Sequence, residues 1–166
     1  MASTDDIRAF IAEVRAFQQF TDSELLALAA SLREKSLRKG QVLLRQGDMS
    51  DEMYVVRRGS LVISKPVTGR VEQVLARIGP GDFFGEMALF DHSPRSATVQ
   101  ADSDALLLVL DRGALVRLTE QSPRAAAAFY RAMVLEFVQR LRASGDLVAE
   151  VTRWGLEATG LDVESR

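Results

Sequence analysis

Glycine-containing turns divide the middle of this chain, residues 37–111, into a series of short segments. The turns lie at Lys39-Gly40, Gln46-Gly47-Asp48, Arg58-Gly59, Thr68-Gly69 and Gly79-Pro80-Gly81. The segments between them are expected to be strands, at Val42–Arg45, Met53–Arg57, Leu61–Lys65 and Val71–Ile78. Glycine adopts positive φ without steric cost, which suits it to turns between strands. Many short strands at near-regular spacing predict a β-sandwich or jelly roll.

Two more strands are expected after residue 96. Residues Ala97–Ala101 alternate between apolar and polar side chains, which is the pattern of a strand with one buried face. Leu106–Leu110 is a continuous apolar run, which predicts a strand buried on both faces.

Helices are expected before these strands. Residues 5–19 repeat apolar side chains at helical spacing. Thr21 and Glu24 have the spacing of a capping box, so a second helix should begin there and continue to Leu32.

Helices are also expected after the strands. Asp111 should cap a helix over residues 112–120, and Ser122-Pro123 predicts the start of a long helix that ends near Trp154 or Glu157. The expected fold is therefore α+β and mainly β. It comprises N-terminal helices in residues 1–34, a jelly roll (double-stranded β-helix) in residues 35–111, C-terminal helices in residues 112–157 and a tail in residues 158–166.

Length and composition narrow the expected functions. The 166 residues suit one domain with an appended helix. A net charge of −2 gives no general nucleic-acid footprint, and the absence of cysteine excludes disulfides, thiolate metal sites and iron–sulfur sensors. No apolar run approaches about 18 residues, so we expect a cytoplasmic protein with neither a membrane span nor a secretory signal.

The segment Gly79–Val99 carries the chemistry. A glycine turn leads into one short helical turn, a proline breaks that turn, and an arginine opens a strand. Glu86 and Arg95 stand nine residues apart, and a compact turn would bring both to one small site. Such a site could hold a sugar with the carboxylate and a phosphate with the guanidinium.

Two motifs in this segment, Phe84–Leu89 and Pro94–Val99, occur in order at a spacing that resembles the phosphate-binding cassette of cyclic-nucleotide-binding domains. That family includes the bacterial catabolite activator protein, protein kinase A regulatory subunits and cyclic-nucleotide-gated channels. The resemblance covers roughly residues 10–150, and the cassette is also similar to that of bacterial cyclic-nucleotide-gated potassium channels. It implies a cassette at residues 84–97 and reversible, non-catalytic binding of a cyclic nucleotide.

The resemblance also implies a role for several side chains. Arg95 would donate two parallel hydrogen bonds to the phosphate, and Ser96 would add a hydroxyl donor. Glu86 would accept the ribose 2′-hydroxyl and would also interact with Arg95 across the pocket. Gly85 would let the ligand approach the backbone. The expected ligand-binding set is Phe84, Gly85, Glu86, Met87, Ala88, Arg95, Ser96, Ala97 and Ser144.

The identity of the base is less well specified. Domains that favour cyclic GMP often have threonine where this chain has Ser96, so the resemblance favours cyclic AMP and leaves cyclic GMP open. In relatives the last helix covers the pocket, and in the catabolite activator protein a hydroxyl pair on it contacts the adenine. Ser144 corresponds to the first of those hydroxyls, and Gly145 stands where the second would be.

The last helix permits a second interpretation. Its residues Phe137, Leu141, Ser144, Val148 and Val151 form an a/d seam. The chain could therefore form a homodimer through this helix, or be an interaction module that no longer binds a nucleotide. Only about ten residues follow this helix, too few for the DNA-binding module of related transcription factors, so no DNA partner is expected and any downstream protein is unknown.

Catalysis is not expected. A metal-dependent cupin enzyme would need several histidines, whereas His92 is the only one and should be an exposed loop residue. No metal and no catalytic cofactor is therefore predicted. Phe83, Phe84, Leu89 and Phe90 are expected to belong to the core.

Overall fold

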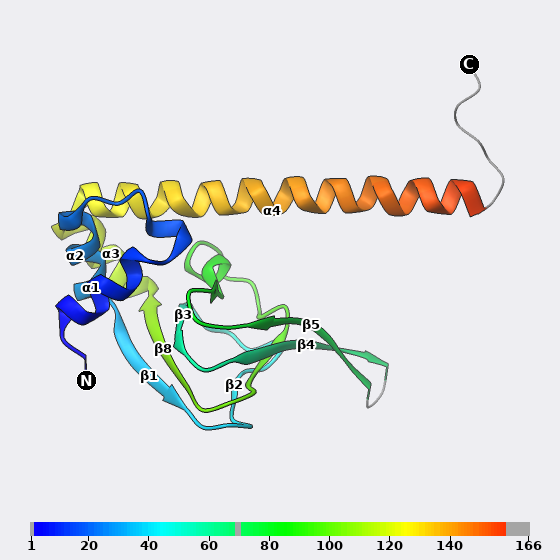
Figure 1. Ribbon diagram of the computed structural model, residues 1–166, viewed down its shortest axis with the longest axis horizontal. Helices are drawn as coiled ribbons and strands as arrows, with labels where there is room; N and C mark the ends of the chain where they lie inside the picture. The colour runs from blue at the N-terminus through cyan, green and yellow to red at the C-terminus, as the bar shows by residue number, and fades with distance from the viewer. Residues whose placement is uncertain (1, 69–70, 159–166) are drawn as a thin grey trace, which may run out of the picture. The chain divides into compact units, whose positions relative to one another are not determined.

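The computed structural model describes residues 2–68 and 71–158, and its elements follow the expected order of helices, strands and helices (Figure 1). They are α1 (Thr4–Ala12), η1 (Arg15–Phe17), α2 (Asp22–Ser31), β1 (Arg33–Leu37), β2 (Val42–Leu44), β3 (Glu52–Arg58), β4 (Leu61–Thr68), β5 (Val71–Ile78), β6 (Phe83–Phe84), η2 (Glu86–Leu89), β7 (Thr98–Ala101), β8 (Ala105–Asp111), α3 (Arg112–Gln121) and α4 (Pro123–Ala158).

The strands form two antiparallel sheets of four strands each. One sheet has the order β1-β8-β3-β6 and the other has the order β2-β7-β4-β5. Strands far apart in the sequence are neighbours, as in the pairing of Arg33 with Val109 and of Val42 with Gln100. This arrangement confirms the predicted fold, an α+β and mainly β jelly roll that is preceded and followed in the sequence by helices.

The core lies between the inner faces of the two sheets. Of the run Leu106–Leu110 in β8, Leu106 is half-buried and the other four residues are at most 1% exposed, which confirms a strand buried on both faces from Leu107 onward. Val99 and Ala101 of β7 are buried and Gln100 is exposed, as the alternation predicted. Tyr54 stacks on Phe84 with ring centroids 5.1 Å apart, so β6 is fixed to β3 by side chains as well as by backbone bonds.

The N-terminal helical region differs from the single helix expected over residues 5–19. The α-helix α1 ends at Ala12, Val14 is extended, and a separate 3₁₀ turn, η1, follows. Ile7, Ile11, Val14 and Phe17 are all buried nonetheless. The apolar spacing therefore identified the buried side chains correctly, whereas the break lets Phe17 stack near Phe83 and Phe129, with centroids 6.4 Å away in both cases.

Two short strands were missed. β1 begins at Arg33, inside the segment expected to hold only helices, and only Leu37 of its residues is buried. Its charged side chains form ion pairs instead, including one of 2.6 Å between Glu34 and Arg57. β6 has only two residues and depends on its partner Tyr54–Val55. Neither strand has the apolar alternation on which a sequence prediction relies.

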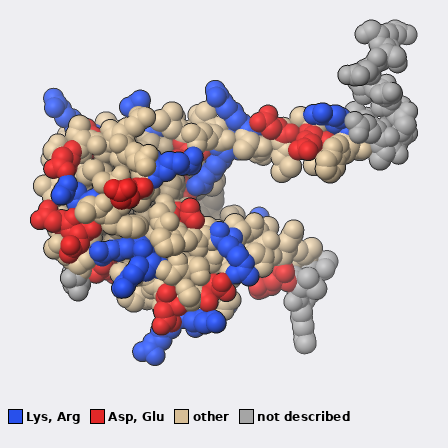
Figure 2. Space-filling model, in the orientation of Figure 1, with Lys and Arg blue, Asp and Glu red and all other residues tan. Residues whose placement is uncertain are grey.

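Several local signals were confirmed. The capping box of Thr21 and Glu24 begins α2, and the Asp111 side chain accepts a hydrogen bond from the Ala114 backbone at the start of α3. Four of the five predicted turns contain a glycine with positive φ; Gly69, in the fifth, lies outside the described residues. Figure 2 shows basic and acidic side chains interspersed over the visible face, in keeping with the small net charge.

The chain divides into two compact units, residues 1–129 and 130–166. The second unit contains the rest of α4 up to Ala158, and most of the predicted tail lies outside the described residues. Large apolar side chains on this part of α4 are exposed, among them Leu141, Val148, Val151 and Trp154. No helix in the described part of the chain is both long and apolar enough to cross a membrane.

Gly59 provides a test of how closely the turns at one end of the β domain approach each other. A Cβ atom at Gly59 would lie 2.3 Å from the Asp104 carbonyl oxygen, whereas a Cβ at Gly40, which has the same φ of +82°, would meet nothing within 4 Å. Gly40→Ala should cost about 1–2 kcal/mol of unfolding free energy through backbone strain alone. Gly59→Ala should cost about 1–3 kcal/mol more because backbone must move. Urea denaturation of both variants measures the difference; equal losses would contradict the close approach.

Candidate functional site

The segment Gly79–Val99 runs from the β5–β6 turn through η2 to β7. Gly85 connects β6 to η2 in the left-handed conformation, with φ of +78°. A Cβ atom there would also lie 2.7 Å from Nη1 of Arg95 and 3.0 Å from the Glu52 carbonyl oxygen. Glycine is therefore required at this position both by the backbone conformation and by the approach of the Arg95 side chain.

Arg95 is 7% exposed, and its guanidinium is held by three acceptors. Nε donates to Oγ of Ser50 over 2.7 Å, Nη1 to the Gly85 carbonyl over 3.1 Å, and Nη2 to the Glu52 carbonyl over 2.5 Å. The Arg95 backbone also exchanges hydrogen bonds with the loop before β3, through Asp48 and Gly47. The side chain is therefore fixed at both ends.

Ser50 and Glu52 are site residues that the sequence analysis missed. They lie 45 and 43 positions from Arg95, and no motif links such distant residues. Glu52 contributes its carbonyl oxygen to Arg95, and its carboxylate accepts a hydrogen bond from the Tyr54 hydroxyl and pairs with Arg33. Burial, followed by the hydrogen bond to Glu52, raises the pKa of the Tyr54 hydroxyl, which therefore remains a donor.

The 3₁₀ geometry of η2 decides which predicted residues are buried. Residues three apart lie on the same side of a 3₁₀ turn. Glu86 and Leu89 are 2% and 4% exposed, whereas Met87 and Phe90 are 62% and 42% exposed. The prediction that Phe90 belongs to the core was therefore wrong, because Phe90 follows Met87 onto the outer side.

Among the predicted site residues, Arg95 and Gly85 are in direct contact, and the other cassette residues lie beside them in the sequence. Phe84 and Ala88 are buried, Ala97 is half-buried and Ser96 is exposed. The direct contact expected between Glu86 and Arg95 is not among the three hydrogen bonds of the guanidinium. Ser144 is an exposed residue of α4 in the second unit, so its contact with the base stays a prediction.

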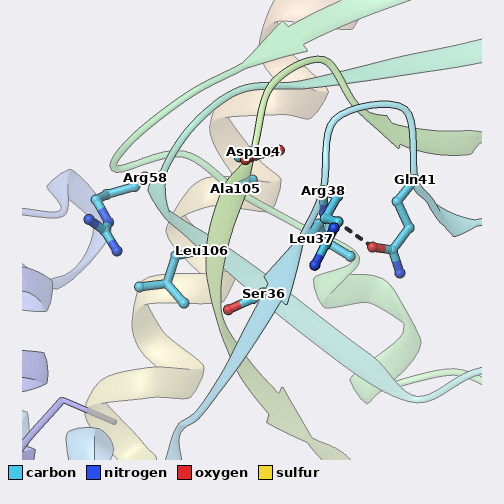
Figure 3. Close-up of a pocket in the computed structure, with 8 residues that line it drawn as sticks. All are labelled: Ser36, Leu37, Arg38, Gln41, Arg58, Asp104, Ala105 and Leu106. Carbon is cyan, nitrogen blue, oxygen red and sulfur yellow. Dashed lines mark hydrogen bonds between the residues drawn. The ribbon is translucent and has the colours of Figure 1, made fainter.

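A separate cavity of about 550 Å³ lies at the other end of β3, where that strand ends at Arg58. Figure 3 shows Arg58 on one side of Leu106 and Ser36, with Arg38 and Gln41 on the other. The Arg38 backbone N–H donates to the Gln41 side chain over 3.2 Å. None of the predicted site residues lines this cavity, so it is distinct from the Arg95 site.

The chain is similar to one known protein family and to several proteins that are named for cyclic nucleotides. The model of the cyclic nucleotide-binding domain family matches residues 34–122. A cyclic nucleotide-gated potassium channel of Mesorhizobium japonicum is 37% identical over 119 residues, which are 72% of this chain and 32% of the channel. A protein kinase A regulatory subunit of Dictyostelium discoideum is 31% identical over 112 residues, which are 66% of this chain and 34% of the subunit.

Solved structures show the same likeness. The N-terminal domain of a transcriptional regulator from Streptomyces coelicolor is 32% identical with a TM-score of 0.70, over 86% of this chain and 94% of that domain. The catabolite activator protein of Thermus thermophilus is 30% identical with a TM-score of 0.68, over 81% of this chain and 62% of that protein. The chain thus spans about a third of the length of the curated relatives named above.

Proposed function

The chain belongs to the cyclic nucleotide-binding domain family, and we propose that it reversibly binds a cyclic nucleotide, without catalysis, at the segment Phe84–Ala97. The observation that carries this proposal is the buried, oriented guanidinium of Arg95 beside the left-handed turn at Gly85. The names of two relatives described above support the proposal, because one is a cyclic nucleotide-gated channel and the other is a regulatory subunit of a cyclic-AMP-dependent kinase.

The hydrogen bonds of Arg95 leave some of its N–H donors unused, and these could bind a phosphate. A guanidinium has five N–H donors, and one each on Nε, Nη1 and Nη2 is used. One N–H therefore remains on each terminal nitrogen, and both can donate to phosphate oxygens. The three partners are a hydroxyl and two carbonyls, so none of them neutralises the positive charge. An anionic ligand would supply that compensation.

The remaining parts of a cyclic nucleotide fit the residues around Arg95. The Glu86 carboxylate is proposed to accept the ribose 2′-hydroxyl, and the exposed Ser96 hydroxyl is free to donate to the phosphate. Ser96 in place of threonine favours cyclic AMP over cyclic GMP. A structure of the regulatory domain of Toxoplasma gondii protein kinase A with cyclic AMP is 26% identical to this chain, with a TM-score of 0.66 over 79% of this chain and 49% of that one. This likeness supports a cyclic nucleotide as the ligand.

We further propose that the ligand acts by shifting a conformational equilibrium. Binding of the phosphate would order the turn at Gly85–Leu89, and the last helix, with Ser144, would close over the base. The exposed apolar side chains of α4 favour a second candidate function, self-association through that helix. An interaction module of this kind would not require a bound nucleotide.

Arg95→Ala should weaken the binding of cyclic AMP by on the order of 2–3 kcal/mol, because charge-assisted hydrogen bonds to the phosphate are lost. Calorimetric titration with cyclic AMP and cyclic GMP, after unfolding and refolding to remove carried-over nucleotide, measures this loss. Arg58→Ala serves as the control, because that arginine is exposed and lies at the other end of β3. Equal affinities of the Arg95→Ala and wild-type proteins would refute the proposed site.

Glu86→Gln should reduce the preference for cyclic AMP over its 2′-deoxy analogue. The amide keeps the size of this buried side chain but accepts a hydrogen bond without a charge, so we expect the discrimination to fall roughly tenfold. Competition binding of the two nucleotides to wild type and variant gives the ratio. An unchanged ratio would mean that another residue recognises the ribose.

Limited proteolysis of α4 beyond residue 130 separates the two proposed roles of that helix. If the helix closes over the base, saturating cyclic AMP should slow its cleavage at every protein concentration. If it mediates self-association, cleavage should slow as the protein concentration rises, with or without cyclic AMP. Cleavage that depends on neither variable would exclude both roles.

A further inference from the structure

Arg112, the first residue of α3, contacts the far end of the turn that follows Gly85. Nη2 donates to the carbonyl oxygens of Ala88 and Asp91, over 2.7 Å in each case. Nη1 lies 2.8 Å from the ring nitrogens of His92. The Arg112 backbone N–H also donates to the Asp51 carbonyl over 3.1 Å. One residue therefore joins the start of α3 to both segments that surround Arg95.

These contacts complete two short hydrogen-bonded paths between Arg95 and Arg112. In the first path, Nη1 of Arg95 and the Ala88 N–H both donate to the Gly85 carbonyl, and the Ala88 carbonyl accepts from Arg112. The Ala88-to-Gly85 bond is 3.2 Å long.

The second path runs through adjacent residues at the start of β3. The Glu52 carbonyl accepts from Nη2 of Arg95, and the Asp51 carbonyl accepts from the Arg112 backbone. A displacement of the Arg95 guanidinium would therefore reach the same residue by both routes, because each route involves backbone groups that cannot move independently of their neighbours.

The Arg112 side chain is not fully satisfied in this arrangement. Its Nε atom is buried and, among the described residues, has no hydrogen-bond partner. Most buried polar atoms in proteins are paired, so an unpaired donor calls for a reason. Here the same guanidinium satisfies one carbonyl in η2, that of Ala88, and one in the loop after it, that of Asp91, and the unpaired Nε is the cost of holding that turn. A shift of the turn would change this balance directly.

We infer that Arg112 is a positioning residue that holds the segment Glu86–His92 against the start of α3 and transmits the ligand state of Arg95 to that helix. The transmitting part rests on the proposed function. When a phosphate binds the unused N–H groups of Arg95 and draws the guanidinium toward it, the Gly85 and Glu52 carbonyls, which stay bonded to that guanidinium, move with it, and Arg112 adjusts in turn. Ala114, Leu115 and Leu118 bury one face of α3, so a displacement of its first turn is carried into the core.

Hydrogen exchange of backbone amides, followed by mass spectrometry, tests both parts of the inference. The proteins are wild type, Arg112→Gln, Arg112→Lys and, as a matched control, Arg117→Gln. Arg117 is exposed on the same helix and belongs to neither path. Thermal unfolding first identifies the variants that fold. Arg112→Lys retains a positive donor group for the carbonyls, so it serves as the rescue variant and as the test if Arg112→Gln does not fold.

Without nucleotide, amides of residues 87–93 should exchange at least about threefold faster in Arg112→Gln than in wild type, because the turn opens locally. Arg117→Gln should match wild type, and Arg112→Lys should lie between. With cyclic AMP at saturation, wild type should change its exchange both at residues 85–91 and at α3. Arg112→Gln should keep the response at residues 85–91 and lose the response at α3. Its affinity for cyclic AMP should be lowered roughly tenfold.

Two results would overturn the inference. Unchanged exchange at residues 87–93 in Arg112→Gln and Arg112→Lys would show that Arg112 does not hold the turn. If the amide exchange of α3 still responds to cyclic AMP in Arg112→Gln, then Arg112 does not transmit the ligand state of Arg95 to that helix. If wild type binds neither cyclic AMP nor cyclic GMP, the proposed function fails and the transmitting role falls with it. The exchange rates without nucleotide then still decide whether Arg112 holds the turn.

Discussion

The buried guanidinium of Arg95 joins three segments that are distant in the sequence: the loop at Ser50, the start of β3 at Glu52 and the turn at Gly85. A buried cation needs hydrogen-bond acceptors, and the fold supplies them as two backbone carbonyls and a hydroxyl. Backbone carbonyls are set by strand pairing and turn geometry, so the arginine and the local backbone fix each other. Because these acceptors are uncharged, the site retains a positive charge available to an anion.

The short turn after Gly85 links this site to the helices. Its 3₁₀ geometry turns Glu86 inward and Met87 outward, and its last carbonyls meet Arg112 at the start of α3. Two arginines therefore hold the two ends of one turn, one at the proposed ligand site and one at the first residue of a helix. The two arginines are separated by only a few peptide groups, so the proposed binding of an anion at Arg95 would have a short hydrogen-bonded route to α3.

Prediction from the sequence succeeded where residues within one segment act on each other. The capping box at Thr21, the N-cap at Asp111, the glycine turns and the buried run in β8 all depend on neighbours in the chain. It failed where a distant partner decides the outcome. β1 is a strand because β8 pairs with it, and the helix expected over residues 5–19 ends at Ala12, so that Phe17 enters the core from the separate turn η1. Phe90 was misplaced because apolar character alone does not give the phase of a 3₁₀ turn.

The sequence by itself determined the jelly-roll class, the position of the cassette and the pair of residues proposed to hold a sugar and a phosphate. These features are carried by local turn chemistry and by a motif whose spacing is fixed along the chain. Only the tertiary structure decided that Ser50 and Glu52 orient Arg95, that the guanidinium bonds to backbone rather than to Glu86, and that Arg112 contacts the end of the turn. Those contacts join residues more than 20 positions apart, and they exist only once strand pairing has brought the segments together.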